Sequence, residues 1–362
     1  MADAAATPAQ PSRWHSLRVR AVVDETHDAK SLVFDMPAQS AEPGTVWRYR
    51  PGQFLTLRLP VEGRHLPRCY SMSSAPGVDD ALRVTVKRVN GGRGSNWICD
   101  RLKAGDQVEV LPPAGVFTPT TLEGDFLLLA GGSGITPVFS ILRSALAQGH
   151  GRIVLLYANR DERSVIFRQE LKALAAAHPA RLLVIHWLDS VQGVPSVAEL
   201  AELARWQRGA QAFICGPGPF MDTAVAALQA IEIPPERIHV ERFVSLPDEP
   251  TGAEAPMVAT ATAPAAAPAV DEAQVELRLD GQVHHLRCSG SETLLEAALR
   301  AGIAAPHSCQ AGLCAACMCQ VQEGSVHLRH NEALDKKDLA KAWTLACQAV
   351  PTSERLRIKF PE

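Results

Sequence analysis

No stretch of this 362-residue chain reaches 18 consecutive apolar residues, which argues against a membrane-spanning helix. The first residues also lack the basic segment and apolar core of a signal peptide, so we expect a disordered tail at 1–13 and a cytoplasmic location. The net charge is only −3 and no basic stripe is present, which argues against nucleic acid as a partner. The sequence therefore predicts a globular protein that binds neither membranes nor nucleic acids.

The sequence also lacks the features of a disulfide framework. Its nine cysteines are an odd number, and most of them lie in the last third of the chain without an export signal. Free thiols in a reducing compartment are available for a metal or a cofactor. Three of them follow the spacing Cys-x4-Cys-x2-Cys in the segment PHSCQAGLCAACMC, and a fourth lies alone in LACQAV. These four are Cys309, Cys314, Cys317 and Cys347.

This spacing is that of plant-type [2Fe–2S] clusters, in which three thiolates come from one loop and the fourth from a distant element. Structural zinc is the main alternative, but zinc sites usually pair two short knuckles and only one is present here. A Rieske centre needs two histidines, and no second histidine matches His307. The four cysteines are therefore predicted to hold a [2Fe–2S] cluster, with Cys319 and Cys288 as buried structural thiols.

The character of the sequence changes along the chain in a way that predicts several domains. Short β-like runs between glycine and proline turns predict an antiparallel barrel, and the alternating strand and helix patterns after it predict an open parallel α/β sheet. Half of the 28 residues at 245–272 are alanine or proline, which predicts a linker. The predicted divisions are the tail at 1–13, a barrel at 14–120, an α/β domain at 121–244, the linker, and a compact domain at 273–362.

Two segments of the predicted barrel carry groups suited to a phosphorylated, planar cofactor. Within RCYSMSS, Arg68 offers a cation for a pyrophosphate, Tyr70 a ring and Ser71 a hydroxyl. The segment GGRGSNW is a glycine-rich loop that runs into a helix, whose free N–H groups attract phosphate. The alternatives are an ordinary surface strand and an ordinary loop with Ser95 as the helix N-cap. The phosphate-binding candidates in the loop are Gly92, Gly94, Ser95 and Asn96.

A second glycine-rich turn lies between a strand and a helix in the α/β region. LLLAGGSGITP places its glycines where a dinucleotide pyrophosphate lies in open α/β sheets, although the G-x-G-x-x-G order is not kept. A later strand ends in CGPGPFMD, and parallel strands end at the same rim of a sheet. Cys215 could also be an ordinary buried strand thiol. The residues expected at this rim are Gly131, Gly132, Gly134, Cys215, Gly216 and Pro217.

Taken in order, the motifs RCYS, GGRGSNW, GGSGITP and CGPGPFMD and the four cysteines resemble the ferredoxin–NAD(P)H reductase superfamily. More narrowly, the chain after Trp14 is similar to oxygenase reductase components with a C-terminal plant-type ferredoxin domain. The resemblance implies a multidomain fold. Its parts would be an antiparallel β-barrel flavin domain, an α/β open parallel-sheet nicotinamide domain, and an α+β β-grasp [2Fe–2S] ferredoxin domain.

The resemblance also implies roles for individual residues. Ser71, Thr136 and Cys215 would mark the hydride-transfer locus, with Ser71 near the flavin N5. Phe243 would cover the flavin until nicotinamide displaces it, although this chain continues into the linker at that point. The implied flavin-binding residues are Arg68, Tyr70, Ser71, Ser74, Lys87, Gly92, Gly94, Ser95, Thr136 and Phe243. The implied nicotinamide-binding residues are Gly131, Gly132, Gly134, Asn159, Arg160, Cys215, Gly216 and Pro217.

The same resemblance bears on the identity of the cofactors. FAD is expected rather than FMN, because RCYSMSS followed by KRV resembles the FAD-binding branch. Asp161 and Glu162 would repel the 2′-phosphate of NADPH, whereas Arg160 and Arg163 could attract it. The resemblance favours NADH, with NADPH as the alternative.

The implied function is electron transfer from NADH through FAD and the [2Fe–2S] cluster to a terminal oxygenase. In this family the acceptor is a Rieske-type hydroxylase such as 3-ketosteroid 9α-hydroxylase, or a di-iron enzyme such as phenylacetyl-CoA epoxidase. A redox-sensing iron–sulfur flavoprotein is a further alternative, but the sequence shows no partner-binding element for it. The reductase is expected to be monomeric by itself.

Overall fold

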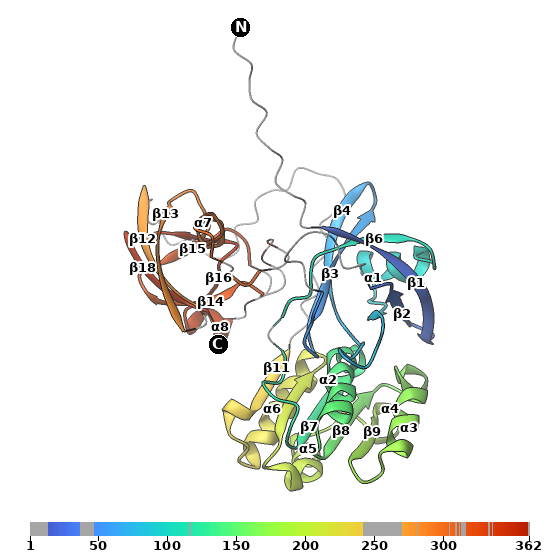
Figure 1. Ribbon diagram of the computed structural model, residues 1–362. Helices are drawn as coiled ribbons and strands as arrows, with labels where there is room; N and C mark the ends of the chain where they lie inside the picture. Colours follow the sequence, from blue (N-terminus) through green and yellow to red (C-terminus); the bar gives the residue numbers. More distant parts are fainter. Residues whose placement is uncertain are drawn as a thin grey trace.

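The computed structural model contains three main β-sheets that follow one another along the chain (Figure 1). Phe243, Cys309, Cys314 and most of the predicted linker lie outside the residues that it describes. No helix among the described residues is long and apolar enough to cross a bilayer. The described residues are 14–36, 47–115, 117–241, 270–279, 281–303, 305–307, 310, 312, 316–331, 334 and 336–360.

The first sheet has six antiparallel strands in the order β4-β3-β6-β1-β2-β5. A bridge between Met72 and Val84 joins its two outer strands, so the sheet closes into the predicted barrel. Apolar side chains that point inward form one core, which α1 also covers with Ile98 and Cys99. The elements are β1 (His15–Thr26), β2 (Ala29–Phe34), β3 (Phe54–Val61), β4 (Arg64–Ser71), β5 (Leu82–Lys87), α1 (Arg93–Arg101) and β6 (Gln107–Val110).

The second sheet is the predicted open parallel sheet, with the strand order β11-β10-β7-β8-β9. Its inner strands β7, β8 and β10 are buried on both faces, because α2 and α3 contribute to one apolar cluster and α5 and α6 to another. The chain order reverses between β7 and β10, and ligands of open α/β sheets bind at the carboxyl ends of such strands. The elements are β7 (Phe126–Gly131), α2 (Ile135–Gln148), β8 (Ile153–Asn159), α3 (Arg168–Ala177), β9 (Leu182–Leu188), α4 (Asp189–Gln192), α5 (Val197–Ala204), β10 (Gln211–Cys215), α6 (Gly218–Ala230) and β11 (Ile238–Glu241).

The third sheet is mixed, with the order β13-β12-β18-β14-β16 and a parallel pair of β12 with β18. Helix α7 packs its buried leucines and alanines on one face of this sheet, and a capping box of Thr293 and Glu296 fixes its first turn. This is the predicted α+β ferredoxin fold. The elements are β12 (Glu272–Leu279), β13 (Gln282–Ser289), α7 (Leu294–Arg300), β14 (Met318–Glu323), β15 (Val326–Leu328), α8 (Lys336–Ala340), β16 (Trp343–Leu345), β17 (Ala349–Pro351) and β18 (Arg355–Lys359).

The barrel and the α/β domain contact one another through buried polar groups. The loop between β4 and β5 lies on α2: the Ser140 hydroxyl donates to the Ser74 carbonyl at 2.6 Å, and Arg143 donates to Asp79 at 2.8 Å. These bonds place the carboxyl end of β4 next to the carboxyl edge of the parallel sheet. These contacts hold together the two halves of a site between the domains.

Arg83 on β5 makes a second contact between these domains. Its guanidinium donates to Glu170 of α3 at 2.8 Å and lies 4.9 Å from the centre of the Phe167 ring. Phe139 stacks on Phe167 with ring centroids 4.3 Å apart, and Phe167 takes a left-handed conformation at φ +60°. Arg83 is 15% exposed and Glu170 is 41% exposed, so the ion pair lies at the edge of the interface and helps to hold the two domains together.

Candidate functional site

The predicted flavin motif lies on β4, opposite β3. Arg68 pairs with Leu57 and Tyr70 with Leu55, so both side chains point to the same face of the barrel wall. The amino end of α1 packs on this face: a Cβ added to Gly94 would lie 3.0 Å from Arg68 Cγ and 3.5 Å from the Tyr70 hydroxyl. The structure therefore brings Arg68, Tyr70 and Gly94 together, and a side chain larger than that of glycine would press on the Arg68 stem.

Some polar groups of the loop that precedes α1 form hydrogen bonds within the loop. The N-cap of α1 is Gly92, not Ser95, and it has no side-chain hydrogen bond. The Ser95 hydroxyl accepts from the Val89 backbone N–H at 3.1 Å, and the Asn96 amide donates to the Val89 carbonyl at 3.2 Å. Ser95 and Asn96 thus hold the loop, and the first backbone N–H groups of α1 are the phosphate donors that this segment offers.

Three of the residues predicted for the catalytic locus lie at the junction of the two domains. Ser71 ends β4, Cys215 ends β10, and Thr136 lies in the first turn of α2 with its hydroxyl donating to the Ser133 carbonyl at 3.1 Å. All three are buried. Burial also raises the pKa of Cys215 well above its ordinary value, so its sulfur is a neutral thiol and not a nucleophile.

Glu241 is a residue of this junction that the sequence interpretation missed. It ends β11, pairs with Cys215 in the parallel register, and accepts a hydrogen bond from the Ser71 hydroxyl at 3.2 Å. Burial raises the pKa of Glu241 to about 8, and the Ser71 bond only partly opposes this. The segment VERF draws attention only to Phe243, which lies outside the described residues. The missed signal is a single carboxylate at the carboxyl end of a parallel strand next to the strand of Cys215.

The two glycine-rich turns of the α/β domain meet at one rim, as their positions after parallel strands predict. A Cβ on Gly134 would lie 2.1 Å from the Cys215 carbonyl oxygen, so the turn after β7 closes directly on the end of β10. Gly131 similarly contacts Pro217, the N-cap of α6, and Gly216 is buried beside it. Gly132 has a φ of +51°, and a Cβ there would lie 3.7 Å from Lys87 Nζ of the barrel. The structure thus places the lysine over the turn.

The ends of β8 and β9 carry buried polar atoms that lack partners among the described residues. The Asn159 side chain is 4% exposed and lies near the Tyr157 hydroxyl, but neither its oxygen nor its nitrogen makes a hydrogen bond of good geometry. One carboxylate oxygen of Asp189 is also buried without a hydrogen-bond partner, and the loss of hydration raises the pKa of Asp189. The Ser190 N–H donates to the Arg160 carbonyl at 2.9 Å and joins the two strand ends. Such orphaned groups fit a polar ligand like a ribose.

The acidic residues predicted to repel a 2′-phosphate are engaged elsewhere. Asp161 caps a short helical turn by accepting from the Ser164 N–H at 3.0 Å, and Glu162 pairs with Arg168 at 2.7 Å. The carboxylate that follows β9 is the half-buried Asp189, the first residue of α4, which the sequence interpretation did not single out. A carboxylate there disfavours a phosphate on the ribose by charge repulsion.

Two of the four predicted cluster ligands are described, and they lie together. The Cys347 N–H donates to Cys317 Sγ at 3.4 Å, and both thiols are buried in the core of the third sheet. Cys319 is fully buried, and burial raises its pKa, as expected for a structural thiol. His307 Nδ1 lies 2.8 Å from the Ala305 carbonyl oxygen, which agrees with its exclusion as a Rieske ligand. An N–H directed at a ligand sulfur fits an iron–sulfur cluster.

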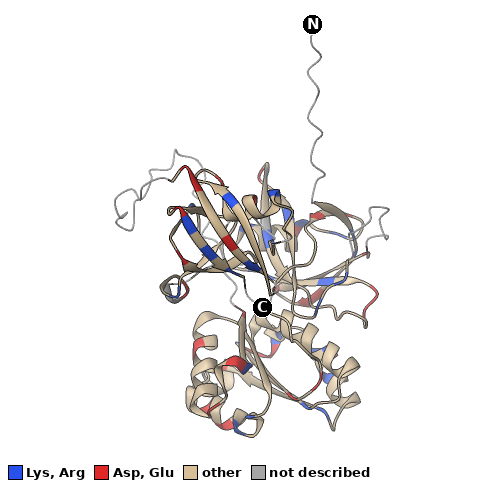
Figure 2. Ribbon diagram, turned by 60° about the vertical axis from the view of Figure 1, so that its left-hand side comes forward, with Lys and Arg blue, Asp and Glu red and all other residues tan. Residues whose placement is uncertain are grey.

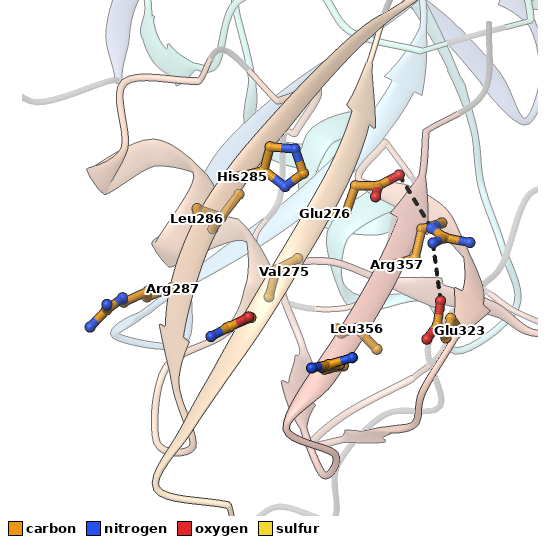
Figure 3. A pocket seen from close by; sticks show the side chains of 10 residues that line it. Val275, Glu276, His285, Leu286, Arg287, Glu323, Leu356 and Arg357 are labelled. Carbon is orange, nitrogen blue, oxygen red and sulfur yellow. Dashed lines mark ion pairs between the residues drawn. The ribbon is translucent and has the colours of Figure 1, made fainter.

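A pocket of about 540 Å³ opens on the outer face of the third sheet, but it contains none of the predicted site residues. Arg357 lies between two carboxylates, with Glu276 and Glu323 each 3.2 Å away (Figure 3). Figure 2 shows acidic and basic segments interspersed along the strands of this sheet. Because the charges pair with one another, the pocket is a salt-bridged sheet surface and not a binding site for one sign of charge.

Comparison with protein-family models divides the chain into three matches. Residues 16–118 match the oxidoreductase FAD-binding domain, residues 128–226 the oxidoreductase NAD-binding domain, and residues 277–352 the 2Fe-2S iron-sulfur cluster binding domain. These matches and the geometry agree on the cofactors, which are FAD, NADH and a [2Fe–2S] cluster. The described residues fit them through the Gly94 cradle, the orphaned Asn159 amide and the Cys317–Cys347 contact.

Curated relatives extend the similarity over the whole chain. The chain is 49% identical over 350 residues to the ferredoxin reductase component of 3-ketosteroid-9-alpha-monooxygenase from Rhodococcus rhodochrous, covering 96% of this chain and 97% of the relative. It is 34% identical to one subunit of the 1,2-phenylacetyl-CoA epoxidase from Escherichia coli, covering 96% and 98%. Among solved structures, phthalate dioxygenase reductase matches with a TM-score of 0.58 at 23% identity, covering 96% of this chain and 98% of that one. That last likeness shows the shared modular fold.

Proposed function

Since the chain belongs to the family of oxygenase reductase components with FAD-, NAD- and [2Fe–2S]-binding domains, we propose that its electrons go to a 3-ketosteroid hydroxylase of the Rieske type. The chain itself is an NADH-dependent oxidoreductase whose partner is a terminal oxygenase. The observation that carries the steroid assignment is the 49% identity to a ketosteroid reductase over 96% of the chain, against 34% to the relative from the epoxidase.

The bound groups would supply redox chemistry that amino acids lack: a flavin converts a two-electron hydride into single electrons, which a [2Fe–2S] cluster carries onward. The protein binds and orients them. Arg68 and the amino end of α1 hold the flavin pyrophosphate, and Tyr70 lies against the ring system. Lys87, which the resemblance assigns to the flavin, lies above the turn at Gly132, so we propose that it would hold the nucleotide pyrophosphate together with that turn.

Ser71 and Glu241 supply a proton-holding pair at the junction of the domains. With a pKa near 8, Glu241 keeps a proton on its carboxyl at neutral pH, directly beside the Ser71 hydroxyl. A protonated, buried carboxyl can stabilise or move a proton where charge changes, without placing a fixed negative charge in the site. Cys215 and Thr136 shape the same junction and keep water out.

Asn159 and Asp189 are proposed to bind the ribose that distinguishes the two nicotinamide nucleotides. Their unpartnered oxygens and nitrogen can bond a ribose hydroxyl, and the Asp189 carboxylate disfavours a 2′-phosphate. The role of Phe243 and the complete set of four cluster ligands stay predictions. So do the cytoplasmic location, the monomeric state and the domain limits given above.

Electron delivery to matched oxygenases tests the steroid assignment. The purified reductase is combined in turn with the oxygenase component of a 3-ketosteroid 9α-monooxygenase and with the oxygenase component of phenylacetyl-CoA epoxidase, and product formed per NADH is measured. We expect at least a tenfold higher product yield with the ketosteroid oxygenase. A higher yield with the epoxidase would contradict the assignment, and no product with either would move the partner to another oxygenase class.

A further inference from the structure

The turn between β1 and β2 of the flavin barrel places one carboxylate beside the nucleotide turn of the other domain. Asp28 is the second residue of this turn and its side chain is only 16% exposed. The Thr26 hydroxyl donates to one of its carboxylate oxygens at 2.8 Å, and the Asp28 carbonyl accepts from the Arg88 N–H at 2.7 Å. Thr26 of the same hairpin therefore orients the carboxylate, and the residue after β5 holds the main chain of Asp28.

The second carboxylate oxygen of Asp28 faces two cations from different elements. Arg160, the residue after β8, donates to it at 2.9 Å, and Lys87 Nζ of β5 lies 3.8 Å from it. Lys87 is 18% exposed and is the residue that lies over Gly132. One oxygen atom of the barrel is thus shared by a cation at the pyrophosphate turn and a cation at the end of the second parallel strand.

Charges of both signs surround this carboxylate oxygen. Burial would raise the pKa of Asp28, but the Thr26 hydroxyl and the nearby Lys87, His27 and Arg160 charges outweigh it and lower that pKa, so the carboxylate is ionised at neutral pH. His27 lies 3.8 Å from the same oxygen, and Asp161 is a second carboxylate close enough to act on both Lys87 and Arg160. A 2′-phosphate carries nearly two negative charges. To bind it, a site needs cations that are not already paired with a carboxylate.

We propose that Asp28 is a positioning residue for nucleotide choice: it neutralises Arg160 and restrains Lys87, so that a 2′-phosphate finds no available cation and NADH is preferred over NADPH. The proposal rests on the proposed function, in which this rim binds NADH. It differs from the repulsion by Asp189, since Asp28 acts through the cations that it holds. If Asp28 only held the two domains together, its loss would instead weaken the binding of both nucleotides equally.

The test compares Asp28→Asn with the wild type in the FAD-loaded full chain, and first measures binding alone. Isothermal titration gives the Kd of 2′,5′-ADP, which carries the 2′-phosphate, and of 5′-AMP, which does not. We expect Asp28→Asn to increase the affinity for 2′,5′-ADP about tenfold relative to the affinity for 5′-AMP, which corresponds to about 1.4 kcal/mol of binding free energy. The gain should shrink between 50 and 300 mM salt, because it is electrostatic. The ratio of kcat/KM for NADPH to that for NADH, measured with a dye, should rise about as much, mainly through KM.

Asp24→Asn is the matched control, because Asp24 is a carboxylate of the same hairpin that pairs with Lys30 at 3.2 Å and is 77% exposed. It removes the same charge and should leave both Kd values unchanged. When Arg160→Ala is added to Asp28→Asn, the increased affinity for 2′,5′-ADP should disappear. Arg160→Ala by itself should change the Kd of 2′,5′-ADP less than twofold. This single variant tests the proposal even where Asp28→Asn does not fold.

Three results would overturn the proposal. The first is a ratio of the Kd values of 2′,5′-ADP and 5′-AMP that is unchanged in folded Asp28→Asn. The second is an equal loss of affinity for both ligands in that variant. The third is a tenfold loss of affinity for 2′,5′-ADP in Arg160→Ala alone. The last would show that Arg160 already binds the 2′-phosphate beside an intact Asp28. If wild-type protein does not oxidise NADH at all, the proposed function fails instead, and the binding ratio still decides the role of Asp28.

Discussion

A carboxyl group at neutral pH is ordinarily ionised, but Glu241 lies where ionisation is costly. It is half-buried at the end of β11, beside Cys215 and Ser71, and the loss of hydration there raises its pKa to about 8. The unfolded chain would ionise this group near 4.5, so the folded protein binds an extra proton between pH 4.5 and about 8. The contribution of Glu241 to the free energy of unfolding is therefore lost as the pH rises across that interval.

Glu241→Gln should slow the reduction of bound flavin by NADH about ten- to hundredfold, since the variant keeps the shape and loses the exchangeable proton. Stopped-flow absorbance measures the rate. The wild-type rate should decline above pH 8 and the variant rate should not. The midpoint of thermal unfolding should also fall more from pH 5 to pH 8 in the wild type than in Glu241→Gln. Parallel pH profiles for the two proteins would show that Glu241 has no proton role.

At the scale of elements, the glycine turn after β7 depends on contact between main chains. Gly134→Ala would place a methyl group 2.1 Å from the Cys215 carbonyl oxygen, and neither strand end can withdraw without disturbing the parallel sheet. We expect a loss of about 1–3 kcal/mol in the free energy of unfolding and a higher KM for NADH. Thermal unfolding and steady-state dye reduction measure the two effects.

Gly218→Ala is the control for that variant, because a Cβ at the start of α6 meets no atom within 4 Å. It should match the wild type in both measurements. A Gly134→Ala protein as stable as Gly218→Ala would show that the turn can shift, and that the close contact at Cys215 does not position it.

The elements themselves could be predicted from sequence because each has a local signal. Alternating apolar and polar residues predict the barrel strands, and apolar runs between helical segments predict the parallel sheet. The spacing of the cysteines predicts that Cys317 and Cys347 lie together, and the structure shows them in contact. The contact of Ser71 with Glu241 joins residues 170 positions apart, and that of Asp28 with Arg160 joins residues 132 apart. Both depend on how two domains pack, which leaves no local pattern in either segment.

At the scale of the whole molecule, the account requires electrons to pass from one domain to another. Cys317→Ala removes a proposed cluster ligand from the third domain, so we expect lost iron and lost electron delivery to the oxygenase. Flavin reduction by NADH should stay within twofold, because the flavin and nucleotide domains make their own contacts through Arg83, Arg143 and Ser140. Iron analysis and parallel dye and oxygenase assays measure this.

Cys319→Ala is the matched control for the cluster, since Cys319 is two residues away and fully buried but is assigned no iron. It should keep its iron and its delivery of electrons. Iron lost equally from both variants would show that the loss follows from disturbed packing, and the assignment of Cys317 as a ligand would then have no support.

Electron transfer from NADH to the third domain is tested most directly by an anaerobic titration of the purified protein with NADH, followed by visible absorbance and low-temperature EPR. We expect the flavin bands to bleach and a rhombic signal of a reduced [2Fe–2S] cluster to grow in the same titration. Bleaching of the flavin with a silent cluster, or protein without iron, would contradict it, because the third domain would then carry no electrons.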